Sequence, residues 1–336
     1  MRAVFVAVIM GWFCFAGLGQ PRTGSITGLV SDPSHKPTPD VTVEAKHIET
    51  DVFYKAKTSS TGEYTFAQLP AGTYEVSILR PRPFIRRGVT VEPGGSQRLD
   101  IQLPLSVDAN TLGELGALIA VYAKRPPPPE GPAPRMADGK PDFSGVWIAR
   151  PSDIVPLVFS PPVELLPWAE ALVRERILND DRDRPSSRCL PNDPVLLSVL
   201  GHKYVQTRTL LVHLVVDVVA AHQVFLDGRA HPKDLEPNWL GYSIGKWEGD
   251  TLIIDTIGFN DRSWFFNTVP HTEMLHVTER LRRLDLGHLE IETTYDDPGT
   301  FTAPVTFTIV NLLAPDEEIG EYVCENNQYN PRTDAK

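Results

Sequence analysis

Short stretches of alternating hydrophobic and polar residues follow one another between residues 24 and 103. This alternation is typical of β-strands that bury one face. It is clearest where Val41, Val43 and Ala45 share one face of a predicted strand. Turn-forming residues, mostly Gly, Pro, Asp and Ser, separate the stretches. About seven strands of this kind predict a β-sandwich.

The hydrophobic pattern changes beyond residue 141. Residues 162–179 place apolar side chains at helical spacing and predict one helix. Farther on, strand spacing returns, and Glu248-Gly249-Asp250 marks a tight hairpin. The predicted strands of this part are residues 204–209, 211–218, 222–226, 242–247, 251–257, 275–283, 289–294, 305–312 and 319–324. Such a series with one helix indicates an antiparallel barrel or a strongly curved sheet.

Composition and charge narrow the class of protein. The 336 residues include 31 Pro and 24 Gly, a content that disfavours long helical bundles. Hydrophobic residues make up 41% of the chain, which is enough for real cores and too much for wholesale disorder. Acidic residues (43) outnumber basic ones (32), and the net charge is −11. This balance argues against a nucleic-acid partner or an anionic membrane surface, because both need clustered Lys and Arg.

A proline run divides the chain. Pro126 to Pro129, followed by Glu130-Gly131-Pro132, predicts an extended, semi-rigid spacer. The predicted fold class is mainly β: a seven-stranded β-sandwich joined by a Pro-rich linker to an antiparallel β-barrel-like domain with one helix. The predicted signal peptide, sandwich, linker and barrel-like domain occupy residues 1–19, 24–103, 104–140 and 141–330, respectively.

The first segment has the features of a secretory signal peptide. Met1-Arg2 supplies a positive start, residues 3–19 are almost wholly apolar or small, and cleavage is expected before Gln20. The protein is then exported to the periplasm or the extracellular space, without a stable membrane span after cleavage. A retained anchor stays open as the alternative, because the apolar stretch is near spanning length.

Cysteine usage agrees with export. Cys14 leaves with the signal peptide, so the exported chain keeps Cys189 and Cys324. We expect these two to form a disulfide in an oxidising compartment, which constrains the unfolded chain by about 4–5 kcal/mol. The alternative is two unpaired, buried thiols. Two cysteines alone cannot build a structural zinc site.

Motifs in the first half resemble a known family. They are Gly28-x-Val30-x-Asp32, Thr61-Gly62-Glu63-Tyr64-Thr65-Phe66, Leu69-Pro70-Ala71-Gly72-Thr73-Tyr74 and Val89-Thr90-Val91. On these motifs, residues 24–103 resemble the carboxypeptidase regulatory-like domain, whose sandwich is transthyretin-like (prealbumin-like) and is grouped with carbohydrate-binding-like folds. The resemblance implies an accessory role and supplies no active site, because metallocarboxypeptidase chemistry belongs to a different, zinc-bearing domain.

The second half resembles a family of uncharacterised exported bacterial proteins. The motifs that carry this resemblance are Asp227-Gly228-Arg229-x-His231-Pro232, residues 239–252, residues 255–261, Pro270-His271, residues 275–280 and Cys324-Glu325-Asn326. No activity comes with this resemblance. In addition, Gly145-x-Trp147 before a predicted barrel is similar to the opening of lipocalins.

Two short motifs suggest catalysis, and both conflict with the predicted elements. Gly241-x-Ser243-x-Gly245 fits a nucleophile elbow, but an elbow needs a helix after it and a hairpin follows here. His276-x-x-Glu279 matches half of a metallocarboxypeptidase zinc site, but residues three apart on a strand face opposite sides. We therefore expect neither a serine hydrolase nor a carboxypeptidase, and we assign no metal site.

A looser group of His and carboxylate residues is the stronger candidate site. A barrel can bring several of them inward, where His beside a carboxylate can bind a metal or move protons. The candidate catalytic residues are His231, Asp255, His271, His276 and Glu279. The alternative is that these residues only form hydrogen bonds in loops and salt bridges on the surface.

Every Trp outside the signal peptide lies in the second domain. Aromatic rings line ligand pockets, and in barrels they also fill the core. The candidate ligand-binding residues are Trp239, Trp247 and Trp264, together with Arg229.

Two functional hypotheses follow from the sequence. The first is an exported bacterial protein with an accessory β-sandwich and a β-barrel-like domain that binds a small molecule or carbohydrate. The alternative is an extracytoplasmic enzyme, a hydrolase or isomerase, that uses the His/carboxylate group. At this point the catalytic status, the cofactors and the oligomeric state stay open.

Overall fold

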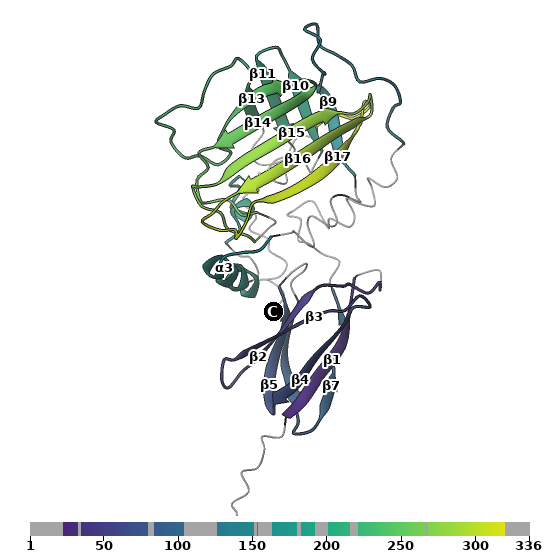
Figure 1. Cartoon of the computed structure of the whole chain (residues 1–336), viewed down its shortest axis with the longest axis vertical. Coiled ribbons are helices and arrows are strands. Elements are labelled where there is room, and N and C mark those ends of the chain that lie inside the picture. The colour runs from purple at the N-terminus through teal and green to yellow at the C-terminus, as the bar shows by residue number, and fades with distance from the viewer. Residues whose placement is uncertain are drawn as a thin grey trace, which may run out of the picture. The chain divides into compact units, whose positions relative to one another are not determined.

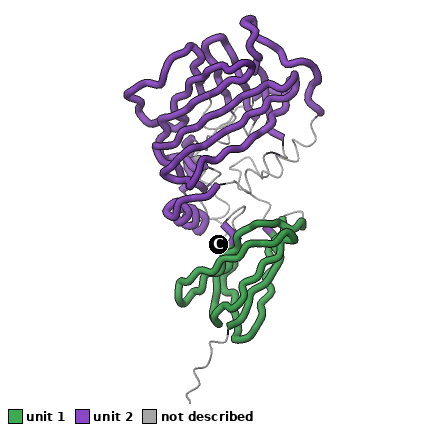
Figure 2. The backbone as a smooth tube through the Cα atoms, viewed as in Figure 1, with its two compact units in different colours: residues 1–77, 85–102 green, residues 78–84, 103–336 purple. Residues whose placement is uncertain are grey.

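The structure, a computed structural model, describes residues 23–32, 35–79, 84–103, 126–150, 153, 163–179, 183–191, 201–215, 221–265 and 268–319. The predicted signal peptide and Cys324 lie outside the described residues, so the cleavage and the disulfide stay predictions. The chain divides into two compact units (Figure 2). Unit 1 comprises residues 1–77 and 85–102, and unit 2 comprises residues 78–84 and 103–336.

Unit 1 is built from two four-stranded sheets (Figure 1). Its strands are β1 (Thr23–Ser31), β2 (Thr42–His47), β3 (Phe53–Lys57), β4 (Glu63–Pro70), β5 (Gly72–Ile78), β6 (Phe84–Val91), β7 (Ser96–Arg98) and β8 (Ile101–Gln102). One sheet has the order β4-β1-β7, with β8 also paired to β1. The other sheet has the order β3-β2-β5-β6.

The predicted β-sandwich is confirmed. Alternation buries Ile26 and Val30 on β1, and Val43 and Ala45 on β2, with no exposed surface on any of the four side chains. Burial of each such side chain stabilises the unit by about 1.5–3 kcal/mol. Eight strands form in place of about seven, because β7 and β8 pair separately with β1, both in parallel.

Unit 2 contains a closed barrel (Figure 1). Its strands are β9 (Gly145–Ala149), β10 (His202–Gln206), β11 (Leu210–Val215), β12 (Ala221–Phe225), β13 (Tyr242–Glu248), β14 (Thr251–Ile257), β15 (His276–Arg283), β16 (His288–Asp296) and β17 (Val305–Leu313). They follow one another around the ring in chain order from β10 to β17, and β9 closes the ring between β17 and β10.

The barrel is antiparallel at every pair except β12–β13. A closed ring of nine strands cannot alternate in direction throughout, because nine is odd, so it needs a parallel pair. The parallel register places Val224 beside Ser243 and Phe225 beside Ile244. Parallel neighbours need a crossover connection. Residues 226–241 form it and are called the crossover loop below.

The strand that closes the ring precedes the other eight in the chain. β9 pairs with both β10 and β17, at positions where the sequence suggested only the opening of the domain. The strand predicted at 319–324 lies almost entirely outside the described residues. The barrel with one α-helix is thus confirmed, with β9 as its ninth strand.

An apolar core fills part of the barrel. Its fully or nearly fully buried members are Phe143, Trp147, Tyr204, Leu211, Val224, Leu252, Ile254, Leu281, Leu289 and Ile291. The rings of Phe143 and Trp247 stack with centres 5.5 Å apart. The Arg283 guanidinium lies 4.8 Å from the centre of the Trp147 ring and donates to the backbone oxygen of Asp142. The residues just before β9 therefore pack into the barrel.

The end of the Pro-rich region lies along the barrel. Arg135 forms an ion pair with Asp250 in the β13–β14 turn, with Nη2 and Oδ2 2.6 Å apart. The amide of Leu286 donates to the oxygen of Gly131 at 2.9 Å. These contacts place residues 131–135 on unit 2. An ion pair this exposed contributes little to stability, so its main effect is on the position of the chain.

The α-helix, α3 (Pro167–Leu178), lies within the predicted range 162–179. Pro167 stands at its start, where a missing amide hydrogen costs nothing. The indole of Trp168 donates to the oxygen of Gly299 at 2.8 Å, and Arg176 donates to the oxygen of Thr268 at 2.7 Å. The helix thus packs on loops that follow β14 and β16. In the described part of the chain, no helix has the length and hydrophobicity to cross a membrane.

Candidate functional site

Polar side chains face the barrel interior on consecutive strands. Alternate residues of a strand share a face, so the inward faces follow from core members such as Leu211 and Leu281. The polar residues on these faces, called the polar belt below, are His202, Tyr204, His213, His222, Ser243, Thr256, Glu279 and Thr293, on β10 to β16. Small-molecule sites typically combine such polar groups with an apolar lining.

Three rings form one end of the belt. Tyr204 and His213 lie with ring centres 4.5 Å apart, and His202 lies 4.8 Å from His213. All three side chains are nearly or fully buried. Burial raises the pKa of the Tyr204 phenol well above its usual value, and the charge of Glu279 raises it further. Tyr204 and Glu279 therefore interact electrostatically inside the barrel.

Hydrogen bonds continue the belt across β12, β13 and β14. His222 Nε2 and Ser243 Oγ are 2.7 Å apart, and Ser243 Oγ and Thr256 Oγ1 are also 2.7 Å apart. Burial lowers the pKa of His222 to about 4, so its imidazole is neutral near pH 7. Ser243 lies within strand β13. A nucleophile elbow needs its serine at a turn between a strand and a helix, so Ser243 does not occupy one.

Glu279 is the carboxylic acid of the belt. It lies between the buried residues Val277 and Leu281 on the inward face of β15. Its carboxylate makes no hydrogen bond or ion pair with any residue that the structure describes. Burial raises its pKa to about 7. Glu279 therefore changes charge near neutral pH without a protein partner that would hold it ionised.

The inner wall beside Glu279 is not completely packed. Glu279, His222 and Phe307 point inward, yet neighbouring atoms leave part of the surface of each uncovered. The unpartnered oxygens of Glu279 are also not among the fully enclosed unpartnered atoms of the described residues. Phe307 pairs in register with Thr293, which pairs with Glu279. These residues therefore border space that a water molecule or a ligand group can enter.

Asn311 adds a second unpartnered polar group to the inner wall. It is fully buried on β17, between register partners Leu289 and Ala149. Neither atom of its side-chain amide has a hydrogen-bond partner among the described residues. An unpartnered buried amide costs about 1–3 kcal/mol, which a bound polar molecule or water would offset.

A different group of candidates meets on the outer face of the barrel. His231 Nε2 donates to Asp255 Oδ1 at 2.6 Å, and His276 Nε2 donates to Asp255 Oδ2 at 2.8 Å. Partial burial raises the pKa of Asp255, but the hydrogen bonds from His276 and His231 outweigh it and leave the pKa below its usual value. We call these three residues the outer cluster. The His276 side chain is 44% exposed, so solvent reaches the cluster.

The outer cluster attaches the crossover loop to the barrel wall. His231 belongs to the loop, Asp255 to β14 and His276 to β15. Farther along the loop, the amide of Asn238 donates to the oxygen of Gly258 at 2.9 Å. His231 Nδ1 is buried and has no hydrogen-bond partner in the described part of the chain. The loop is thus held at two places, at Asp255 on β14 and at Gly258 just after β14.

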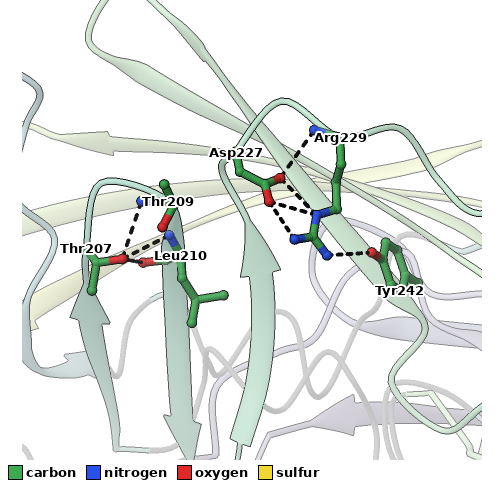
Figure 3. Close-up of polar contacts among 6 residues, drawn as sticks. All are labelled: Thr207, Thr209, Leu210, Asp227, Arg229 and Tyr242. Carbon is green, nitrogen blue, oxygen red and sulfur yellow. Dashed lines mark hydrogen bonds and ion pairs between the residues drawn. The ribbon is translucent and has the colours of Figure 1, made fainter.

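Arg229 secures the start of the same loop. Figure 3 shows its guanidinium between Asp227 and Tyr242, with Nε 2.8 Å from Asp227 Oδ1 and Nη1 3.3 Å from the Tyr242 hydroxyl. The guanidinium also lies 3.9 Å from the centre of the Phe225 ring, which stacks on Tyr242. Hydrogen bonds to Asp227 and then Tyr242 raise the pKa of Arg229. Arg229 therefore joins the two parallel strands on their outer side.

His271 lies apart from both groups. It is 2% exposed, its Nε2 is 2.7 Å from Ser263 Oγ, and its ring stacks on Phe265 at 4.6 Å. Burial lowers its pKa. Its Nδ1 faces the backbone oxygen of Thr272 at 3.2 Å, so no carboxylate orients the ring as in a Ser-His-Asp arrangement.

The candidate Trp residues have three different environments. Trp247 packs between Phe143 and Lys140, whose Nζ lies 5.5 Å from the ring centre. Trp264 is 8% exposed and is covered by the guanidinium of Arg176 at 3.8 Å. Trp239 lies half-buried in the crossover loop. Trp239 and Trp247 thus keep part of their surface uncovered, whereas Trp264 is buried.

Sequence reasoning missed several members of the polar belt. His202, Tyr204, His213 and Thr293 were not among the candidates. The sequence did contain one indication of a buried polar residue: His213 stands between Leu211 and Val215 on the apolar face of one strand. A His in that position is buried and must be satisfied by a neighbour or a ligand. Among the described residues, no group of three or more His, Cys, Asp or Glu side chains is arranged to hold a metal ion.

Comparisons with known proteins bear mainly on unit 1. The family model of the carboxypeptidase regulatory-like domain matches residues 25–104. No curated protein matches the chain. The predicted kinship of the second half with uncharacterised exported proteins stays a prediction.

Solved structures with partial similarity come from three bacteria. A proposed carbohydrate-binding protein from Pseudomonas aeruginosa has 17% identity, with 26% of this chain and 93% of that chain covered, and a TM-score of 0.19. Another, from Bacteroides uniformis, has 9% identity, 88% and 100% coverage, and a TM-score of 0.22. A 9R-lipoxygenase from Cyanothece has 11% identity, 88% and 43% coverage, and a TM-score of 0.17. Similarity at this level assigns no activity. The family model thus matches the region of the chain that contains the sandwich of unit 1.

Proposed function

We propose that this chain is an exported binding protein whose barrel takes a small, hydroxyl-rich molecule, such as a carbohydrate, into its interior. The observation that carries the proposal is Glu279, an inward-facing carboxylate whose surface is only partly covered and that no described residue binds. A barrel of eight or so strands can hold one small ligand. The sandwich of unit 1 serves as an accessory module.

The chemistry of the polar belt suits such a ligand. Imidazoles and hydroxyls both donate and accept hydrogen bonds, as sugar hydroxyls do. Ser243, Thr256 and Thr293 supply hydroxyls, and His222 supplies a neutral imidazole. Phe307 offers an aromatic ring near Thr293, and aromatic faces pack well on sugar rings. The apolar core below the belt provides the remaining wall.

A ligand panel tests this function. We would titrate the exported chain with mono- and disaccharides and measure heat of binding and thermal stability. A bound sugar should raise the melting temperature, and Thr293→Val should weaken its affinity by about tenfold through one lost hydrogen bond. Thr294→Val is the matched control, because Thr294 faces outward and bonds Thr306 at 2.8 Å. Equal losses in both variants, or no binding by any sugar, would contradict the proposal.

The outer cluster supports a second candidate function, an enzyme that transfers protons. A carboxylate that holds two imidazoles orients each ring for general acid–base catalysis. His276, with nearly half of its side chain exposed, is the ring that a substrate can reach. We assign His271 and Glu279 no role in this enzyme, because His271 bonds Ser263 away from the outer cluster and Glu279 faces the barrel interior.

Turnover of 4-nitrophenyl esters and glycosides tests the enzyme. His276→Ala should lower the rate at least about a hundredfold if His276 acts as the base. His288→Ala is the matched control, because His288 also pairs with an aspartate (Asp285, 2.8 Å) away from the outer cluster. Absent turnover, or the same rate in wild type and His276→Ala, rejects this candidate.

A further inference from the structure

We propose that the interior ligand carries a protonated amine, which Glu279 binds inside the barrel. This inference rests on the proposed binding function and specifies its ligand class: a small organic cation with hydroxyl groups, such as an amino sugar or an amino alcohol. It stands on the position of Glu279, on the groups that surround it and on the absence of a protein cation near it in the described residues.

The described inner wall offers Glu279 no positive partner. Arg283 is the cationic residue on the inward faces of the described strands. Its guanidinium is engaged by the backbone oxygens of Asp142 and Leu286 and by the Trp147 ring. Lys203, Lys246, Arg280 and Arg282 stand at the alternate, outward positions. The carboxylate therefore has to find its counter-charge in solvent or in a ligand.

The polar-belt groups that share the inner wall with Glu279 are hydroxyls, a phenol and imidazoles. Its neighbours on β14 and β16 are Ile254 and Thr293, neither of which titrates. The other titratable members of the polar belt are the phenol of Tyr204, which interacts electrostatically with Glu279, and the imidazoles of His202, His213 and His222. Of these, the His222 imidazole resists protonation because it is buried. The phenol oxygen and the neutral imidazole can accept the remaining hydrogens of an ammonium group.

The aromatic rings of this region also favour a cation. Phe307 is only partly buried, stacks on Tyr295 with ring centres 5.5 Å apart and pairs in register with Thr293. Ring faces attract ammonium groups, and the attraction grows where water is excluded. A neutral sugar can donate hydroxyl hydrogen bonds to Glu279 but brings no opposite charge. An ammonium adds the attraction between its positive charge and the carboxylate, which is strongest where water is excluded.

Binding of the amine should expel a proton from the protein. Burial raises the pKa of Glu279 to about 7, so at about pH 6 the acid is mostly protonated. An ammonium beside it favours the carboxylate, and the released proton passes to the buffer. The heat of binding then depends on the ionisation enthalpy of the buffer, which gives a readout independent of affinity.

Matched sugars test the inference on the whole exported chain. We would measure binding of glucosamine, glucose and N-acetylglucosamine calorimetrically at about pH 6 in two buffers, with 2-aminoethanol to separate an amino alcohol from an amino sugar. Glucosamine should bind at least about tenfold more tightly than the two neutral sugars, with proton release. Glu279→Gln should abolish both the preference and the release. Glu292→Gln, on the outward face of β16, should change neither.

The outcomes separate the two proposals. Equal affinity for glucosamine and glucose, or unchanged preference in Glu279→Gln, would overturn the amine inference and leave interior sugar binding in place. If Glu279→Gln still prefers glucosamine, the amine binds at another site, and the proposal that Glu279 binds it is overturned as well. Folded protein that binds none of the four compounds and no sugar of the wider panel would overturn the binding function itself. If Glu279→Gln fails to fold, Glu279→Asp, which withdraws the carboxylate by one methylene, should weaken glucosamine selectively.

Discussion

His276 and Glu279 stand three residues apart on β15 and face opposite sides of the barrel wall. His276 joins Asp255 outside, at 2.8 Å, whereas Glu279 points inside toward the polar belt. The period of two along a strand accounts for the separation. Two residues that resembled half of one metal site in the sequence therefore belong to two different environments, one on the outer face of the barrel and one inside it.

The buried position of Glu279 has a consequence for stability. Its pKa is 4.5 in the unfolded chain and about 7 in the folded one. Between these values the folded state binds more protons, so stability falls as the pH rises through this window. We expect wild type to lose about 2–3 kcal/mol relative to Glu279→Gln from about pH 4.5 to about pH 8. Urea unfolding of both proteins at several pH values measures the difference.

Glu292→Gln provides the control for this pH series. Glu292 lies on the outward face of the neighbouring strand, near Arg280 at 3.8 Å. Its substitution should shift stability by nearly the same amount at every pH above about pH 5. Parallel curves for wild type and Glu279→Gln would show that the Glu279 carboxyl is as easily ionised as a surface group, contrary to the expectation.

The parallel pair β12–β13 is the irregular element of the barrel. It has two register pairs, whereas β15–β16 has eight. Side chains reinforce this junction on both faces: His222 and Ser243 inside, Arg229 and Tyr242 outside. The crossover loop that parallel strands require is held by the outer cluster. A structural role for His231 and Asp255 thus exists whether or not they also act chemically.

Asp255→Asn tests the attachment of the crossover loop. An amide can accept from one imidazole but not from both, so one anchor is lost. We expect a loss of about 1–2 kcal/mol in stability and faster trypsin cleavage after Lys233 in the loop. Mass spectrometry of the fragments follows the cleavage. Asp234→Asn, a change of the same chemistry at an exposed loop position, should leave the rate unaltered. Unchanged cleavage in Asp255→Asn would mean that the outer cluster does not hold the loop.

At the scale of the whole molecule, the chain consists of two compact units with separate cores. Every Trp of the predicted exported chain lies within residues 141–330, so Trp fluorescence reports unit 2. Ile26→Ala, in the core of unit 1, should cost about 2–5 kcal/mol there and leave the fluorescence transition in place. Leu281→Ala, in the barrel core, should shift that transition by a similar amount. Circular dichroism and fluorescence, recorded on the same urea series, distinguish the two outcomes. A common shift of both signals in either variant would show that the units unfold together.

Much of the fold was predictable because its signals are local. The predicted strands 242–247 and 251–257 match β13 and β14 to within one residue, since alternation and a Gly-containing turn depend only on near neighbours. The site was less predictable. His231, Asp255 and His276 were among the candidates and meet. The three-residue spacing of His276 and Glu279 already indicated opposite faces of one strand, but nothing in the sequence indicated which face lies inside the barrel.

The sequence by itself determined the type of the elements, the division into sandwich and barrel, and the alternation that separates two faces of each strand. The tertiary structure decided which face is inside, that β9 closes the ring against β17, and that one strand pair runs parallel. The physical reason is that barrel closure depends on register between strands far apart in the chain, such as Ala149 beside Asn311. Only that closure gathers His213, Tyr204 and Glu279 from three strands into one interior.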